Sequence, residues 1–213
     1  MAGVYKHGTY GEFAGSISST AVQSKTIPVY IGTAPVNLIR GYAEAGAVNE
    51  PVLISTLAEA KRMAGYSAGW TDFTLGEAIK AHFDNKSGSI GPIVLINVLD
   101  PDKHKKEGEP TAANLTFANG RAIIKSDTII LDTLALAGKT EGVDFTVDYD
   151  DKSGAVIIDS IGEKLTGIIE ATYSEVDPAA VTEADIIGGA ASGGYTGLGA
   201  VQLGHPSLDL IPN

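Results

Sequence analysis

The segment Gly65-Tyr-Ser-Ala-Gly69 matches the G-x-S-x-G pattern of hydrolase nucleophile elbows. That motif works because a buried strand leads into the serine and a helix follows directly, so that the sharp turn exposes the serine oxygen. Here the preceding residues have the pattern of a helix, which we expect to end at Gly65. The sequence therefore predicts a helix-ending turn, and a serine hydrolase that uses Ser67 is kept as an alternative function.

The acidic run from Asp148 to Asp159 has part of the spacing of a calcium loop. Such a loop needs glycine at its sixth position for a sharp turn and oxygen ligands at alternating positions. Ser153 stands sixth, Gly154 stands seventh, and Lys152 occupies a ligand position. A turn between two strands accounts for this run better.

The other residues that could take part in chemistry do not show the spacing of a catalytic or binding site. The four histidines are scattered, at His7, His82, His104 and His205. The chain has no cysteine, which excludes disulfides and thiolate metal ligands. The glycines from Gly188 to Gly199 match no phosphate-binding motif, so we expect a flexible or tightly turning connection. We expect no catalytic, cofactor-binding or metal site, no cofactor, and no enzyme.

Composition indicates a soluble globular protein. Of 213 residues, 44% are hydrophobic and 19% are charged, which permits a sizeable core. The net charge of −11 repels phosphate backbones and anionic membranes, so neither nucleic acid nor a membrane is an expected partner. The longest apolar run, Ile93–Leu99, is too short to span a bilayer. Residues 1–10 lack the apolar stretch of a signal peptide.

The first half of the chain predicts a small α/β domain over residues 26–101, preceded by an extended arm over residues 1–25. The order is strand, helix, helix, strand. Both helices are expected to begin at capping boxes, Thr56-Leu-Ala-Glu59 and Thr74-Leu-Gly-Glu77. The strand at Ile93–Leu99 shows no polar alternation, which is typical of a strand buried on both faces.

The second half predicts a different architecture after the charged loop Asp100–Pro110. We expect strands at Arg121–Ile124, Thr128–Leu136, Val143–Tyr149, Ala155–Asp159 and Gly167–Tyr173. They predict a small antiparallel β-sandwich or barrel, inserted as residues 102–177. Residues 178–213 are interpreted as a return segment that holds a short helix capped at Thr182-Glu-Ala-Asp185, and as the start of a truncated C-terminal α/β domain. The expected fold class is a multidomain α+β or α/β protein.

Several segments in a fixed order resemble phage tail sheath proteins. They are Thr26–Pro35, Asn49–Ala60, Gly65–Ser67 with Trp70, Thr74–Ile79, Gly91–Pro101, Val181–Gly189 and Tyr195–Gly197. Each segment alone is weak evidence for the family, but the order and spacing of the segments together are specific to it. The likeness covers nearly all of this chain and about the front half of the family's pattern, so we expect a shortened chain, a proteolytic product or an unusually short member.

The resemblance implies a structural subunit of a contractile tail, located in the virion tail and assembled in the host cytoplasm. Its partners would be neighbouring sheath subunits, joined by swapped terminal arms, and the tail tube protein. The sheath would shorten around the tube and drive it through the bacterial envelope. The inserted β domain would face outward. The 213 residues alone are expected to form a monomer or a weak dimer.

A third function stays open, a carbohydrate-binding or adhesin-like module built on residues 114–173. It would need an exposed aromatic platform. The candidates are Phe117, Phe145, Tyr149 and Tyr173.

Removal of residues 1–25 tests whether they are an assembly arm. Because these residues show no periodic apolar pattern, their deletion should leave the melting temperature nearly unchanged. The same deletion in the full-length subunit should prevent polymer formation, as seen by electron microscopy. A large drop in melting temperature would instead make the segment part of the folded core.

Overall fold

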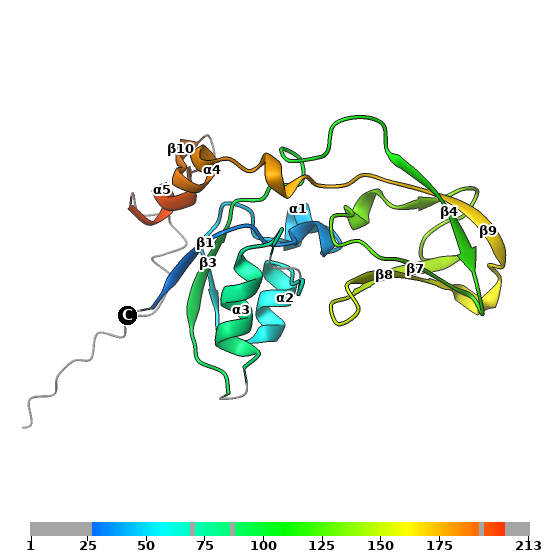
Figure 1. Ribbon diagram of the computed structural model, residues 1–213, viewed down its shortest axis with the longest axis horizontal. Helices are drawn as coiled ribbons and strands as arrows, with labels where there is room; N and C mark the ends of the chain where they lie inside the picture. The colour runs from blue at the N-terminus through cyan, green and yellow to red at the C-terminus, as the bar shows by residue number, and fades with distance from the viewer. Residues whose placement is uncertain (1–26, 69–70, 86–87, 192–193, 203–213) are drawn as a thin grey trace, which may run out of the picture.

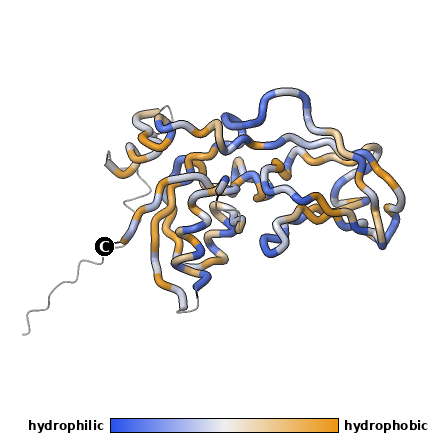
Figure 2. The backbone as a smooth tube through the Cα atoms, viewed as in Figure 1, coloured by the Kyte–Doolittle hydropathy of each residue, from blue (hydrophilic) through white to orange (hydrophobic). Residues whose placement is uncertain are grey.

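The computed structural model describes residues 27–68, 71–85, 88–191 and 194–202. The predicted arm and the chain end after residue 202 lie outside these residues. Figure 1 shows an elongated molecule in which helices and a small sheet occupy one end and antiparallel strands occupy the other. We call residues 27–101 the first part and residues 102–177 the β part. Figure 2 shows hydrophobic residues along the strands of both parts and hydrophilic residues along the loop that joins β3 to β4.

The sheet of the first part has the strand order β1-β3-β2. Its strands are β1 (Val29–Gly32), β2 (Val52–Ile54) and β3 (Ile93–Asn97). β1 runs parallel to β3, and β2 runs antiparallel to it. The predicted first and last strands of the first part are confirmed as β1 and β3, whereas β2 was not predicted. A 3-10 turn η1 (Val36–Leu38) and the short helix α1 (Tyr42–Ala45) lie between β1 and β2.

Helices α2 (Leu57–Met63) and α3 (Leu75–Phe83) pack together over the sheet, in a core that includes Ala60, Ile79 and Leu95. The α2 cap is as predicted, because the Thr56 hydroxyl accepts a hydrogen bond from the Glu59 backbone N–H at 3.2 Å. The Glu59 carboxylate accepts the Ser55 N–H at 2.7 Å. Thr56 therefore caps the helix as predicted, whereas Glu59 binds the N–H one residue before the Thr56 N–H that a capping box uses.

The predicted capping box at Thr74 is wrong. The Thr74 side chain makes no cap to its own helix, because its hydroxyl instead accepts the Thr33 backbone N–H at 3.1 Å. Thr33 in turn accepts two hydrogen bonds from the start of α3. Its hydroxyl accepts the Thr74 N–H at 3.0 Å, and its carbonyl accepts the Leu75 N–H at 2.9 Å. The end of β1 therefore caps α3, and a residue 41 positions away replaces the local Glu77.

The second face of the sheet is covered by the return segment. This segment contains η4 (Pro178–Ala180), α4 (Glu183–Ile187), the paired strands β10 (Gly189–Ala191) and β11 (Gly194–Thr196), and α5 (Gly197–Gln202). Ala200 packs against Ile96 and Val98. β3 is thus buried on both faces, as its unbroken apolar pattern predicts. The glycine-rich stretch forms ordered elements here: a Cβ on Gly188 would lie 2.0 Å from the Thr196 carbonyl oxygen.

The β part consists of two three-stranded antiparallel sheets, ordered β4-β9-β6 and β5-β8-β7. Their bounds are β4 (Thr111–Phe117), β5 (Arg121–Ile124), β6 (Ala135–Leu136), β7 (Phe145–Asp150), β8 (Ala155–Ser160) and β9 (Gly167–Tyr173). Short turns η2 (Leu131–Thr133) and η3 (Ile161–Glu163) connect some of them. Both sheets contribute to one core, which holds Phe117, Phe145 and Ile158. Helices together with small antiparallel sheets place the chain in the α+β class.

The predicted strand at Thr128–Leu136 is wrong over most of its length. Only Ala135–Leu136 forms a strand, after an isolated bridge at Ile129 and the turn η2. The three consecutive residues Ile129, Ile130 and Leu131 are all buried, but Ile130 joins a separate cluster with Phe73. A half-buried strand alternates buried and exposed side chains. Here successive side chains are all buried because they enter two different clusters, so this segment does not need the conformation of a strand. The β-branched composition alone misled the prediction.

Leu38 of the first part belongs to the core of the β part. It is 8% exposed and lies in the same cluster as Leu131 and Phe145. The turn η1 places it there directly after β1 and Pro35. The β part therefore completes its core with a side chain from a distant, earlier segment of the chain.

Substitution of Leu38 by alanine should destabilise the protein by about 2–4 kcal/mol, because it leaves a cavity in the core of the β part. Urea unfolding followed by far-UV circular dichroism measures this loss. Ile123→Ala is the matched control, since Ile123 is an exposed aliphatic residue of β5. Equal losses for the two variants would contradict the placement of Leu38.

Candidate functional site

Ser67 does not lie on a nucleophile elbow. The helix α2 precedes it, and Gly65 takes a left-handed conformation at the helix end, where a Cβ would lie 2.2 Å from the Pro35 carbonyl oxygen. The Ser67 residue is 3% exposed. The helix-ending turn predicted from the sequence is confirmed, and the strand that a nucleophile elbow needs before its serine is replaced here by a helix.

The Ser67 hydroxyl donates to a carboxylate oxygen of Asp127, Oδ2, at 2.7 Å. These residues are 60 positions apart and belong to the first part and the β part. In a serine nucleophile the hydroxyl proton goes to a base such as histidine. Here the hydroxyl of the buried Ser67 donates a hydrogen bond to Asp127, which ties the α2–α3 connection to the β part.

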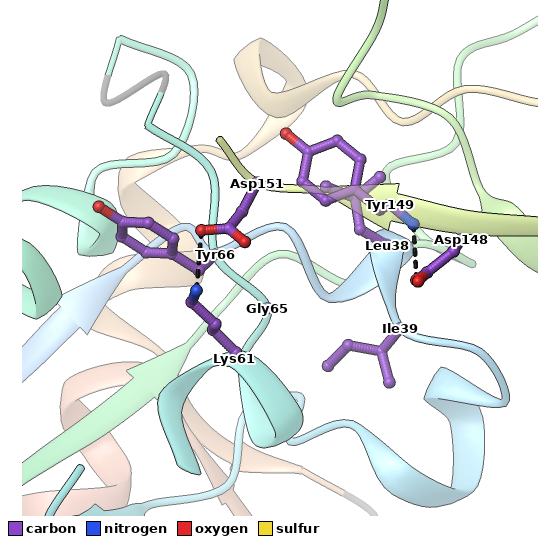
Figure 3. A pocket seen from close by; sticks show the side chains of 8 residues that line it. All are labelled: Leu38, Ile39, Lys61, Gly65, Tyr66, Asp148, Tyr149 and Asp151. Carbon is purple, nitrogen blue, oxygen red and sulfur yellow. Dashed lines mark hydrogen bonds and ion pairs between the residues drawn. The ribbon is translucent and has the colours of Figure 1, made fainter. Parts of the chain in front are cut away.

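A cavity of about 240 Å³ lies beside this contact, between the two parts. Figure 3 shows the side chains that line it: Leu38, Ile39, Lys61, Gly65, Tyr66, Asp148, Tyr149 and Asp151. Lys61 Nζ lies 2.8 Å from Asp151 Oδ2 and 5.7 Å from the centroid of the Tyr66 ring. The ammonium group is thereby paired with a carboxylate and an aromatic face. Burial raises the pKa of the Tyr149 phenol and, with the nearby carboxylates of Asp84 and Asp151, that of Tyr66.

A second group of contacts fixes the turn η1 and the residues after it to the β part. The Asn37 side chain is fully buried, and its amide nitrogen donates to the carbonyls of Asp127 and Ile129 at 3.0 and 2.9 Å. Arg40 Nη1 donates to the Leu131 carbonyl at 2.6 Å, and Arg40 Nη2 pairs with Glu141 at 2.6 Å. We call this set, together with Lys61–Asp151 and Ser67–Asp127, the junction.

The acidic run at Asp148–Asp159 forms the β7–β8 hairpin, as predicted. Asp150 accepts hydrogen bonds from the Ser153 hydroxyl at 2.6 Å and from the Lys152 and Ser153 N–H groups, both at 3.2 Å. These bonds lower the pKa of the Asp150 carboxyl, with the Ser153 hydroxyl as the largest cause. The carboxylate organises a turn.

The aromatic residues of the third candidate function do not form a surface. Phe117, Phe145 and Tyr173 are 5%, 1% and 7% exposed, inside the core of the β part. Tyr149 is half-buried beside the junction cavity. An aromatic platform of these four residues is therefore not present.

The two histidines within the described residues have structural contacts. The His82 ring bonds to the Tyr30 hydroxyl at 2.8 Å and to the Ile90 carbonyl at 2.6 Å. His104 is 3% exposed, and its Nδ1 accepts the Asp100 N–H at 3.0 Å. Its Nε2 lies 3.7 Å from Asp185, a carboxylate that also binds Lys103.

Asp185 joins the return segment to the loop after β3. It accepts the Thr182 N–H at 2.8 Å, which confirms the predicted cap of α4, and it forms an ion pair with Lys103. The hydrogen bond to Lys103 is the largest cause that lowers the pKa of the Asp185 carboxyl, followed by the bond to the Thr182 N–H. Because the folded-state pKa is depressed, any stability from this contact is present at neutral pH and lost in acid.

The described residues show neither a metal cluster nor a membrane-spanning helix. In that part of the chain, no group of three histidine, aspartate or glutamate side chains is placed to hold a metal ion. No helix there combines the length and the apolar character needed to cross a membrane.

The residues that form the junction were not singled out in the sequence. One signal was available, because Asn37 interrupts the apolar run Val36-Asn-Leu-Ile39. A polar residue at a buried position needs partners, and Asn37 finds them in the β part. Asp127, which accepts the Ser67 hydroxyl, carries no comparable signal.

Replacement of Ser67 by alanine should lower the unfolding free energy by about 1–3 kcal/mol, since the half-buried Asp127 carboxylate loses its donor. Chemical denaturation measures the loss, and Ser153→Ala, which removes an exposed hydroxyl from the hairpin turn, is the control for a surface hydroxyl. A fluorophosphonate probe that labels the wild-type chain but not Ser67→Ala would contradict this structural role and support a hydrolase.

Comparison with known proteins identifies the relatives of this chain. It is 32% identical over 211 residues to the tail sheath protein of Burkholderia phage BcepMu, an alignment that covers 95% of this chain and 40% of that protein. The chain therefore spans about two fifths of the length of this relative. No family model matches the chain, and no solved structure matches it. The resemblance inferred from the ordered segments is confirmed, and the chain is a partial-length relative of phage tail sheath proteins.

Proposed function

We propose that the chain is a structural subunit of a contractile tail sheath and not an enzyme. The observation that carries this proposal is the alignment with a tail sheath protein along 95% of the chain. The contacts of the polar side chains agree with it. The buried Ser67, Asn37 and His104 all bond within the fold, to Asp127, to backbone carbonyls and to a backbone N–H. Such bonds serve to hold a subunit together.

Residues 102–177 are an inserted domain in this proposal, between the sheath domain at 26–101 and the return segment at 178–213. The support comes from the place where the chain leaves and returns. The Asp177 N–H donates to the His104 carbonyl at 2.8 Å, and the Lys106 N–H donates to the Glu175 carbonyl at 2.8 Å. An insertion needs its two ends side by side, and these bonds hold them so.

Assembly would proceed through strand edges. β1 is an outer strand of its sheet, and in the described residues only β3 pairs with it. Residues 1–25, immediately before β1, would act as an arm that completes the sheet of a neighbouring subunit. The net charge of −11 repels further copies at low salt, so the 213 residues alone would form a monomer or a weak dimer.

The complete polymer would surround the tail tube protein. Contraction of the sheath would then drive the tube through the bacterial envelope. The protein would be assembled in the host cytoplasm and would reside in the virion tail. The β part would face outward, because it lies at the end of the molecule away from β1 and the return segment (Figure 1).

Immunoelectron microscopy tests this function. Antibodies raised against the 213-residue chain should label tails of particles along their whole length at regular intervals, as a repeated sheath subunit requires. Antibodies preabsorbed with the purified chain are the control. Label confined to one end of the tail, or to the capsid, would overturn the proposal.

A further inference from the structure

One edge strand of the β part lacks the protection that the other edges have. Exposed edges in monomeric proteins are usually short or carry charged residues or proline, which discourage pairing with another chain. β6 is short, with 2 residues, β5 contains Arg121, and β7 contains Asp148 and Asp150. β4 has 7 residues, Thr-Ala-Ala-Asn-Leu-Thr-Phe, and none is charged.

The side chains of β4 leave its edge open to another strand. Ala112, Asn114 and Thr116 are exposed on the outer face, while Leu115 and Phe117 point into the core. β9 pairs with β4 along its whole length on one side. On the other side, no described strand pairs with Thr111–Phe117, because β4 is the outermost strand of its sheet. Figure 1 shows it beside β9, at the end of the molecule away from α4 and α5.

We propose that β4 pairs antiparallel with β4 of a second copy of this chain, about a two-fold axis at Asn114. The strand has a defined start and end: Pro110, which has no N–H, precedes it, and the turn Asn119–Gly120 follows it, with positive φ at both residues. Asn114 is the central residue of the strand Thr111–Phe117. An antiparallel pair about this point places Asn114 opposite Asn114, and Ala112 opposite Thr116 of the partner copy.

The side chains of β4 add no charge repulsion to the pairing of two copies at this edge. Two copies that each carry −11 repel each other, yet the facing strands bring no charged side chain into contact. The Glu170 carboxylates lie one strand further in on each side, since Glu170 pairs with Asn114 within one copy. Screening of the remaining repulsion by salt should strengthen the pairing.

The contact joins two copies and no more. A two-fold contact uses the same surface on both partners, so it cannot propagate into a polymer. A single pair of seven-residue strands buries little area, so the dimer is weak and depends on concentration.

Disulfide trapping tests the pairing directly, because the chain has no natural cysteine. Asn114→Cys in the full 213-residue chain should form a covalent dimer under mild oxidation, seen on non-reducing gels and removed by dithiothreitol. Thr172→Cys is the matched control, since Thr172 lies on the same exposed face but on the central strand β9. Absence of dimer for Asn114→Cys at protein concentrations up to about 1 mM, where weak pairs form, would overturn the proposal.

A charge variant provides the second measurement. Asn114→Asp places two carboxylates opposite each other and should raise the dissociation constant of the dimer by about fivefold or more in analytical ultracentrifugation. Thr172→Asp adds the same charge away from the edge and should leave it within about twofold. Equal effects of the two variants would contradict pairing at β4. The immunolabelling experiment is independent of this one. If tails are labelled but Asn114→Cys forms no covalent dimer, only the pairing of β4 is wrong. If the covalent dimer forms but tails are not labelled, only the proposed function is wrong.

Discussion

The Asn37 side chain is fully buried where the first part meets the β part, and its amide nitrogen donates to the carbonyls of Asp127 and Ile129. A buried amide without partners costs free energy, and so do two buried carbonyls without a donor. Each side of this contact therefore requires the other. Leu38, the next residue, fills the core of the β part, so the same turn supplies both a polar and an apolar attachment. The arrangement of the two parts depends on this turn.

The sequence predicted the elements whose patterns are local. The strands β5 and β9 have the predicted bounds, and the alternating run at Val143–Tyr149 differs from β7 only at its ends. The cap of α2 was also predictable, because the Thr56 hydroxyl and the Glu59 N–H are three residues apart. In each case the residues that determine the element lie within it or directly before it.

The elements that were predicted wrongly depend on residues that lie outside them. Thr74 was assigned to a local cap, but its partner is Thr33, at the end of another element. The run at Ile129–Leu131 enters two clusters that no local pattern distinguishes. The short strand β2 was missed because three residues carry too little periodicity. The candidate site shows the same limit: the motif around Ser67 is visible in the sequence, whereas its partner Asp127 becomes visible only when the chain is folded.

The way the β part is attached limits how it can move. A part joined only by its two connecting segments could pivot about the bonds between His104 and Asp177 and between Lys106 and Glu175. The junction adds attachments from other segments of the chain, at Asn37, Arg40, Lys61 and Ser67. A pivot would have to withdraw Leu38 from the core and expose the Asn37 amide, both of which are costly. The ion pair Lys61–Asp151, with side chains 36% and 27% exposed, contributes less and would yield first. The buried members of the junction therefore oppose a movement of the β part relative to the first part.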